Sequence, residues 1–89
     1  MSSWYLYMIE CRDGSIYTGI ATDVAARYAL HVAGRGARYT RSHPPQKLIA
    51  VIEQADRSSA LKAEYAMKKL PASTKRQIAL KYPAAHEQP

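Results

Sequence analysis

The sequence predicts one small α/β domain of the α+β type, with its elements in the order strand, strand, helix, strand, helix, helix. Three observations lead to this prediction. Asp13-Gly14, a strong hairpin signal, joins two short runs of aromatic and aliphatic residues. A continuous apolar run at residues 48–52 is typical of a buried strand. Two helical segments begin near capping residues and end at Gly34 and Pro71.

The length of the chain indicates a single domain. With 89 residues, one domain is expected, and we assign it to residues 1–82. The polar segment 83–89 is predicted to be a disordered tail.

The hairpin places the first polar side chains. Residues 4–11 are predicted to form the first strand, and residues 15–20 to return antiparallel beside it. Because side chains alternate along a strand, Tyr5, Tyr7 and Ile9 share one face. On the second strand, Tyr17 and Gly19 also share a face.

The first helix is predicted over residues 24–33, where Thr22 or Asp23 can act as the N-cap. Gly34 ends it in the usual C-terminal manner. Arg27 and His31 are four residues apart and therefore share a face. They are either part of a functional site or an exposed polar pair on a surface helix.

Residues 34–45 are predicted to be a loop, since glycines and prolines without apolar periodicity exclude a regular element. The segment holds no acidic residue. Its side chains Arg35, Arg38 and Arg41 suit backbone phosphates, and Tyr39 suits a stacked base. The alternative is a flexible solvated loop.

The last three elements follow this loop. Residues 48–52 are predicted to form a central buried strand. Asp56 or Ser58 caps a helix over residues 58–70, which Pro71 ends. Ser73 or Thr74 then caps a short helix that runs toward residue 81.

Glu64 stands out on the helix at 58–70. The apolar stripe of this helix is Ala60, Leu61, Met67 and Leu70, and Glu64 falls on the same side. A core-facing carboxylate costs several kcal/mol unless it is paired or binds a metal ion. The alternatives are a buried salt bridge to an arginine and a rotation of the helix that exposes the carboxylate.

The charge of the chain indicates its partner. Lys and Arg number 13 against 7 Asp and Glu, which gives a net charge of +6. A small basic domain suits a polyanion, and nucleic acid is the commonest one. The alternative is an ordinary soluble surface. The chain has seven Tyr and no Phe, which indicates that some of the hydroxyl groups are used.

Cysteine content and hydropathy indicate the compartment. Cys11 is the single cysteine, so no internal disulfide can form, which fits a reducing environment. We expect Cys11 to be a packing residue at a strand end, the alternative being a catalytic thiol. No apolar stretch approaches the roughly 20 residues of a membrane span, and the N-terminus lacks signal-peptide features. The expected location is the cytoplasm.

The ordered set of polar residues resembles the GIY-YIG nuclease family. Tyr5-Leu6-Tyr7 stands where the name-giving motif has Gly-Ile-Tyr, and Tyr17-Thr18-Gly19 stands where it has Tyr-Ile-Gly. Arg27, His31, the basic loop, a strand and Glu64 follow in the family's order, so the match spans about residues 4 to 80. The chain looks most like the small stand-alone bacterial members.

The resemblance implies a three-stranded antiparallel sheet flanked by helices and an activity that hydrolyses phosphodiester bonds in DNA with one Mg²⁺ or Mn²⁺ ion. By position, Glu64 would bind the metal ion and Arg27 would hold the scissile phosphate. Tyr17 or Tyr7 would position or deprotonate the water, and His31 would assist proton transfer.

The chain also departs from the family pattern. Tyr5 replaces the first glycine of the name motif, and Gln77 is the nearest candidate for a polar amide that many members carry near the end of the domain. We expect no attached DNA-binding domain in a chain of this length. The expected function is therefore a structure-selective endonuclease linked to DNA repair or recombination, with a protein partner supplying specificity. The alternatives are a catalytically weak DNA- or RNA-binding module and an adaptor in a repair complex.

Overall fold

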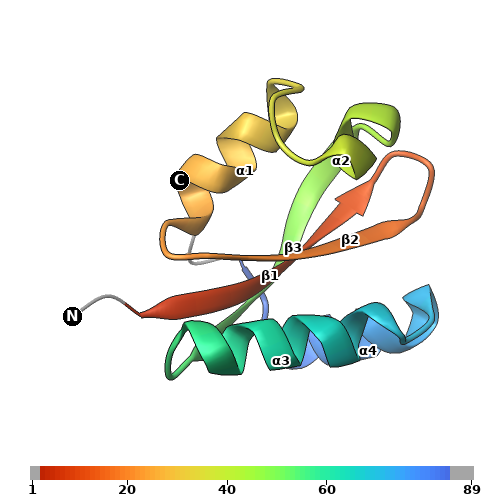
Figure 1. Ribbon diagram of the computed structural model, residues 1–89. Coiled ribbons are helices and arrows are strands. Elements are labelled where there is room, and N and C mark those ends of the chain that lie inside the picture. The colour runs from red at the N-terminus through yellow and green to blue at the C-terminus, as the bar shows by residue number, and fades with distance from the viewer. Residues whose placement is uncertain (1–2, 85–89) are drawn as a thin grey trace.

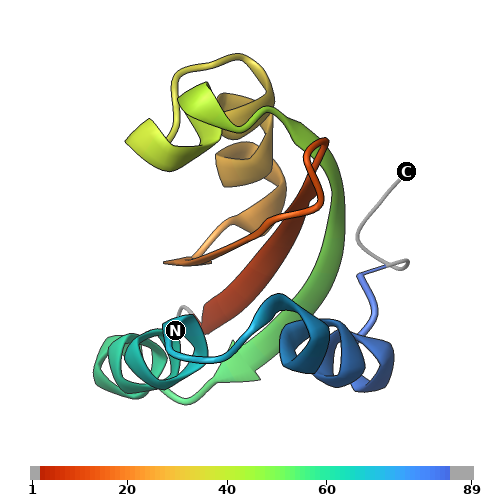
Figure 2. The same cartoon turned by 90° about the vertical axis from the view of Figure 1, so that its right-hand side faces the viewer.

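The computed structural model describes residues 3–84 and shows a three-stranded antiparallel sheet between two layers of helices (Figure 1). The strands are β1 (Trp4–Cys11), β2 (Ile16–Ala21) and β3 (Pro45–Gln54), in the order β2-β1-β3. Helix α1 (Val24–Val32) and the short α2 (Arg38–Ser42) lie on one side of the sheet, whereas α3 (Arg57–Lys68) and α4 (Ala72–Lys81) lie on the other (Figure 2). The predicted α+β class is confirmed.

The β1–β2 hairpin forms where the sequence predicts it. Gly14 adopts a φ of 89°, a conformation that glycine tolerates best, and Asp13 accepts hydrogen bonds from the Ser15 backbone N–H and hydroxyl. The register pairs Tyr7 with Gly19 and Ile9 with Tyr17. These side chains therefore share one face of the sheet, as expected.

The two faces of β1 bury separate apolar clusters, because successive side chains point in opposite directions. Tyr7, Ile9 and Cys11 pack beneath α1. Leu6 and Met8 pack with residues of β3, α3 and α4. The central strand thus contributes to the core on both sides.

Helix termini follow local capping chemistry. The Asp23 carboxylate accepts from the Ala26 backbone N–H, and the Asp56 carboxylate accepts from the Ser59 backbone N–H. Of the alternatives that the sequence left open, the two aspartates are the N-caps. Gly34, after α1, has a φ of 76°, which fits its predicted role. In the part of the chain that the structure describes, no helix could cross a membrane.

Three predicted elements were wrong in detail. The segment predicted as loop contains α2, because the stretch between Gly36 and Pro44 is free of helix breakers. Helix α4 begins at Ala72 rather than near Ser73 or Thr74, since Pro71 has a backbone suited to a helix start.

The third correction concerns β3, which is longer than predicted and is an edge strand, whereas β1 is central. Its central residues are apolar because helices cover both faces of the sheet and the C-terminal segment covers the outer edge of the strand. The Val51 backbone N–H donates to the Tyr82 carbonyl oxygen, and Ala50 forms a bridge with Pro83. Ala84 is buried, so ordered chain extends past the predicted boundary at residue 82. The rest of the predicted tail, 85–89, lies outside the described residues.

Candidate functional site

A buried pair, Tyr7 and His31, lies at the centre of the candidate site. Tyr7 projects from β1 and is 1% exposed, and its hydroxyl lies 2.7 Å from His31 Nε2 on α1. The Tyr17 ring from β2 lies beside both, with centroids 6.3 Å from Tyr7 and 5.1 Å from His31. The structure therefore brings three of the predicted catalytic residues into contact.

Thr40 of α2 determines the tautomer of His31. Its Oγ1 lies 2.7 Å from His31 Nδ1 and donates to the Ala37 carbonyl oxygen at 3.0 Å. A hydroxyl group has one proton, so Thr40 must accept from Nδ1–H. Neutral His31 then has a free lone pair on Nε2, and the Tyr7 hydroxyl donates to it.

The surroundings keep His31 neutral. Burial lowers the pKa of His31 from its usual value of 6.5, and the nearby Arg27 guanidinium lowers it further. At neutral pH the ring is therefore unprotonated, and its Nε2 can accept the hydrogen bond of the Tyr7 hydroxyl.

The side chains of Tyr7 and His31 fit only because the residues next to them, Gly19 and Gly36, have no side chain. A Cβ atom at Gly19 would lie 2.5 Å from the Tyr7 hydroxyl oxygen and 2.7 Å from Cζ. A Cβ atom at Gly36 would overlap the His31 ring. The last residue of the Tyr17-Thr18-Gly19 triplet is therefore glycine because the Tyr7 ring lies across it.

Gly19→Ala is expected to destabilise the fold by about 1–3 kcal/mol, the usual cost of overpacking a core, and to move Tyr7 away from His31. Urea unfolding measures the first effect, and the NMR resonances of the His31 ring report the second. Gly34→Ala is the matched control, because its methyl group would meet no atom within 4 Å and would strain only the backbone. Unchanged stability and unchanged His31 resonances in Gly19→Ala would contradict this account.

Arg27 and Glu64 both act on Tyr7. Burial raises the pKa of Tyr7 to about 12, and the charge of Tyr17 adds to this increase. A hydrogen bond and the positive charge of Arg27 oppose the increase, whereas the negative charge of Glu64 adds to it. Helix α1 therefore supplies Arg27 and α3 supplies Glu64 around the same phenol.

Glu64 lies on the flank of α3 rather than within an apolar stripe. Its side chain is 19% exposed, and its carboxylate lies 3.3 Å from the Lys68 ammonium one turn later. Leu61, predicted to share the buried side, is exposed. The salt bridge considered as an alternative is thus present, with a lysine of the same helix in place of an arginine.

The metal-binding capacity of the site rests on this one carboxylate. Among residues 3–84, no group of three or more His, Cys, Asp or Glu side chains could hold an ion. Mg²⁺ in nucleotide sites is commonly held by one or two carboxylates together with waters and substrate phosphate. The oxygen donors of Glu64 fit that mode of binding.

The basic segment forms the rim of the site. Arg35, Arg38 and Arg41 are exposed. Tyr39 stacks between Tyr17, at a centroid distance of 5.9 Å, and His43, at 4.1 Å. An aromatic row thus leads from the buried pair to the arginines.

A short ion pair secures the outer end of this row. His43 Nδ1 lies 2.6 Å from the Asp13 carboxylate in the hairpin turn. Hydrogen bonds from Ser15 and His43 lower the pKa of Asp13. The end of α2 is therefore attached to the β1–β2 turn.

Cys11 and Gln77, two other residues considered from the sequence, lie outside this site. Cys11 is buried, and burial raises the pKa of its thiol, so it is a packing residue as expected. Gln77 is exposed on α4, a helix on the opposite side of the sheet from α1 (Figure 2).

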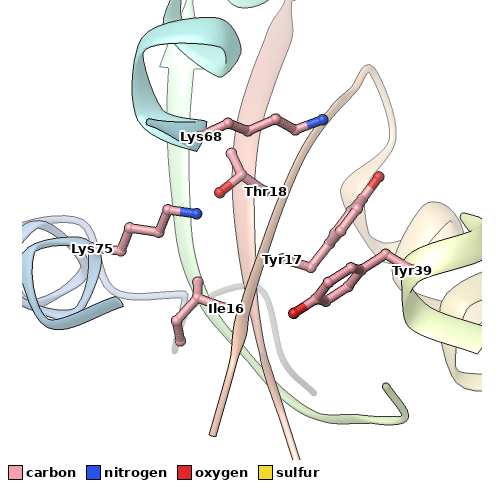
Figure 3. A pocket seen from close by; sticks show the side chains of 6 residues that line it. All are labelled: Ile16, Tyr17, Thr18, Tyr39, Lys68 and Lys75. Atoms are coloured by element: carbon pink, nitrogen blue, oxygen red, sulfur yellow. The ribbon is translucent and has the colours of Figure 1, made fainter. Parts of the chain in front are cut away.

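Sequence analysis missed four residues around the site: Thr18, Thr40, Lys68 and Lys75. Thr40 supports His31, and the other three line a pocket beside Tyr17 (Figure 3). These three pocket residues come from three different elements, and Thr40 reaches His31 from a fourth, so local sequence patterns do not show that they meet.

This chain is similar to known proteins over most of its length. The model of the GIY-YIG catalytic domain matches residues 3–77. A UPF0213 protein of Cupriavidus necator is 48% identical over 93% of this chain and 90% of its own length. A UPF0213 protein of Cupriavidus pinatubonensis is 53% identical over 81% of this chain and 80% of its own length.

Solved structures give the same relationship. The solution NMR structure of a UPF0213 protein from Bacillus halodurans has 38% sequence identity and a TM-score of 0.56, covering 96% of this chain and 90% of that one. The solution NMR structure of a protein from E. faecalis also has 38% identity, with a TM-score of 0.59, covering 100% of this chain and 95% of that one.

Proposed function

Since this chain belongs to the GIY-YIG nuclease superfamily, we propose that it is an endonuclease that hydrolyses phosphodiester bonds in DNA with Mg²⁺ or Mn²⁺. One observation carries the proposal. The hydrogen-bonded row from Tyr7 through His31 to Thr40 is buried, and the charges of Arg27 and Glu64 act on Tyr7. This is an arrangement for moving a proton beside a charged group.

The proposed reaction uses Tyr7 as a proton shuttle. A water molecule attacks the phosphorus atom and gives a proton to the Tyr7 oxygen, while Tyr7 gives its own proton to His31 Nε2. The bond from phosphorus to the leaving oxygen breaks, and that oxygen takes a proton from solvent. A phenol with a pKa of about 12 is a poor free base at neutral pH, but a shuttle never has to exist as phenolate.

In the proposed mechanism, Arg27 and Glu64 stabilise the charge of the transition state. Negative charge gathers on the phosphate oxygens in the transition state, and the Arg27 guanidinium offsets it. Glu64 would hold the divalent ion, which supplies further positive charge when bound. Because both side chains influence Tyr7, the phosphate and the attacking water would meet beside its hydroxyl.

The same site supports the nuclease over the binding-module alternative. A binder of DNA or RNA needs the exposed arginines and Tyr39, but gains nothing from a buried tyrosine aimed at a neutral histidine. We further propose that the protein works in the bacterial cytoplasm, in DNA repair or recombination, with a protein partner that supplies specificity. Bacterial relatives and a free, buried Cys11 support the compartment.

Cleavage assays test the proposed function. Purified protein should cut branched, flapped or single-stranded DNA in Mg²⁺ or Mn²⁺ and cut nothing in a chelator. Protein free of contaminating nuclease that cuts no DNA or RNA with any metal ion would favour the binding module instead.

Changing Arg35, Arg38 and Arg41 together to Ala is expected to weaken DNA binding for every sequence while sparing the rate of bond cleavage. Each lost phosphate contact should reduce the slope of log affinity against log salt by roughly one unit. Binding titrations between low and moderate salt measure this slope. An unchanged slope would mean that the loop does not contact phosphates.

The pKa of His31 makes stability depend on pH. Below its usual value of 6.5, the unfolded chain binds a proton at His31 that the folded chain does not bind. The free energy of unfolding should therefore fall as pH falls below about 6.5. Asp13, whose pKa is also lowered, contributes only at lower pH, because its usual value is 3.8. NMR titration of the His31 ring should give a midpoint below 6.5, and a midpoint at or above that value would contradict the assignment.

A further inference from the structure

The pocket beside Tyr17 lies around the free edge of β2 and adjoins the candidate site. It has a volume of about 400 Å³. Its lining residues come from β2, α2, α3 and α4: Ile16, Tyr17, Thr18, Tyr39, Lys68 and Lys75 (Figure 3). Tyr17 and Tyr39 belong to the aromatic row described above, so the pocket adjoins that row.

Two polar groups in this pocket need a partner. Thr18 is 1% exposed, and its hydroxyl is the one buried side-chain polar atom of residues 3–84 that makes no hydrogen bond. Lys75 is 7% exposed, and Figure 3 shows its ammonium group directed at Thr18. Among the described residues, no carboxylate forms an ion pair with Lys75. A buried hydroxyl and a buried ammonium are both costly when left unpaired.

Lys68 adds a second positive charge to the same pocket. Burial and the charge of Lys68 lower the pKa of Lys75, which shows that the two ammonium groups repel each other. Lys68 also reaches toward the candidate site, since its Nζ lies 3.3 Å from Glu64 and 5.8 Å from the centre of the Tyr17 ring. An anion between the lysines would relieve their repulsion and accept a hydrogen bond from Thr18.

We propose that this pocket is a second phosphate subsite, in which Lys75, Lys68 and the Thr18 hydroxyl hold a backbone phosphate of the nucleic-acid strand next to the scissile one. The identification of the ligand as nucleic acid rests on the proposed function. The strand would pass around the edge of β2, with one phosphate near Arg27 and the next near Lys75. Tyr17, which lines the pocket and touches His31, would lie between them.

The test is binding measured in chelator, so that no cleavage occurs. ¹⁵N NMR spectra are recorded during titrations with inorganic phosphate and with a short single-stranded oligodeoxynucleotide, with and without a 5′-phosphate, at constant ionic strength. Lys75→Met and Thr18→Val are compared with Lys81→Met, which removes the same charge from an exposed position of α4. Thr18→Val keeps the shape of the side chain and removes the unpaired hydroxyl, so it should fold at least as stably as the native chain.

The expected result is that both oligonucleotides shift the amides of residues 18, 68 and 75 in the native chain and in Lys81→Met. Thr18→Val should reduce these shifts, and Lys75→Met should abolish them. Lys75→Met should also make the salt dependence of single-strand binding shallower than that of Lys81→Met by about 0.7 unit of slope. Binding of inorganic phosphate alone, or of the 5′-phosphorylated oligonucleotide alone, would overturn the assignment to a backbone phosphate.

Failure of this inference is distinguishable from failure of the proposed function. If the protein is inactive but its oligonucleotide binding still depends on Lys75 and Thr18, the subsite stands and the nuclease assignment is wrong. If the protein is an active nuclease, and Lys75→Met and Thr18→Val both bind and cut as the native chain does, only the subsite is wrong.

Discussion

Glu64→Gln is expected to abolish metal-dependent cleavage, with turnover reduced by at least about 10³-fold. A divalent ion contributes several kcal/mol of charge stabilisation to a phosphoryl transition state, and each 1.36 kcal/mol corresponds to a tenfold change in rate. The amide keeps the shape of the side chain but loses the charge that would hold the ion. Single-turnover cleavage in Mg²⁺ and in Mn²⁺ measures the loss.

The fold of Glu64→Gln should survive. The carboxylate is partly exposed, and its partner Lys68 is exposed and lies one turn away on the same helix. Pairs of this kind contribute about 0.3–0.5 kcal/mol, so urea unfolding should change little. Glu53→Gln, at an exposed position of β3, is the matched control and should cut normally. Cleavage by Glu64→Gln at the native rate would remove Glu64 from the mechanism.

Arg27→Ala is expected to lower turnover by about 10²-fold or more, with a smaller effect on binding, because it removes a charge that acts mainly in the transition state. It also removes the hydrogen bond and the charge that lower the pKa of Tyr7, so transfer of the Tyr7 proton to His31 becomes harder. Arg27→Lys keeps a charge at this position and should recover part of the rate. Binding titrations and single-turnover rates separate the two effects.

The triple variant of Arg35, Arg38 and Arg41 provides the contrast. It should lose affinity and keep the rate of cleavage, whereas Arg27→Ala should do the opposite. If Arg27→Ala loses only affinity and the triple variant loses only rate, the assigned roles are reversed and the basic segment is the catalytic element.

Features set by neighbouring residues were predictable from the sequence. The Asp13-Gly14 turn set the hairpin, and the alternation of strand side chains placed Tyr7 and Gly19 on one face. The helix starts were predicted to within a residue or two, with Asp23 and Asp56 each among two candidate caps, because capping depends on a residue and the backbone just after it. The resemblance to the nuclease family then supplied the set of candidate site residues.

Features that depend on contacts between distant elements were not predictable. Thr40 supports His31 from a helix of five residues, which is too short to leave a periodic pattern. The edge position of β3 depends on which strand pairs with β1, and its apolar composition resembles that of a central strand. Lys75 and Thr18 share a pocket only because α4 packs near β2.

The position of Glu64 shows the limit of helical periodicity. The stripe of Ala60, Leu61 and Met67 predicted a core-facing carboxylate, but Leu61 is exposed and Glu64 is half-buried. A helix that packs across the edge of a sheet buries a narrow face, so residues at its margin stay accessible to solvent. At that margin the Glu64 carboxylate acts on Tyr7 through its charge and stays accessible to solvent.

A structure of the protein with Mn²⁺ and a short oligodeoxynucleotide tests the central claim most directly, since the anomalous signal of manganese locates the ion without ambiguity. Our account predicts one Mn²⁺ ion bound by the Glu64 carboxylate, with a phosphate against Arg27 and a water beside the Tyr7 hydroxyl. Manganese at another position, with Glu64 still paired to Lys68 and no phosphate near Tyr7 or Arg27, would contradict it.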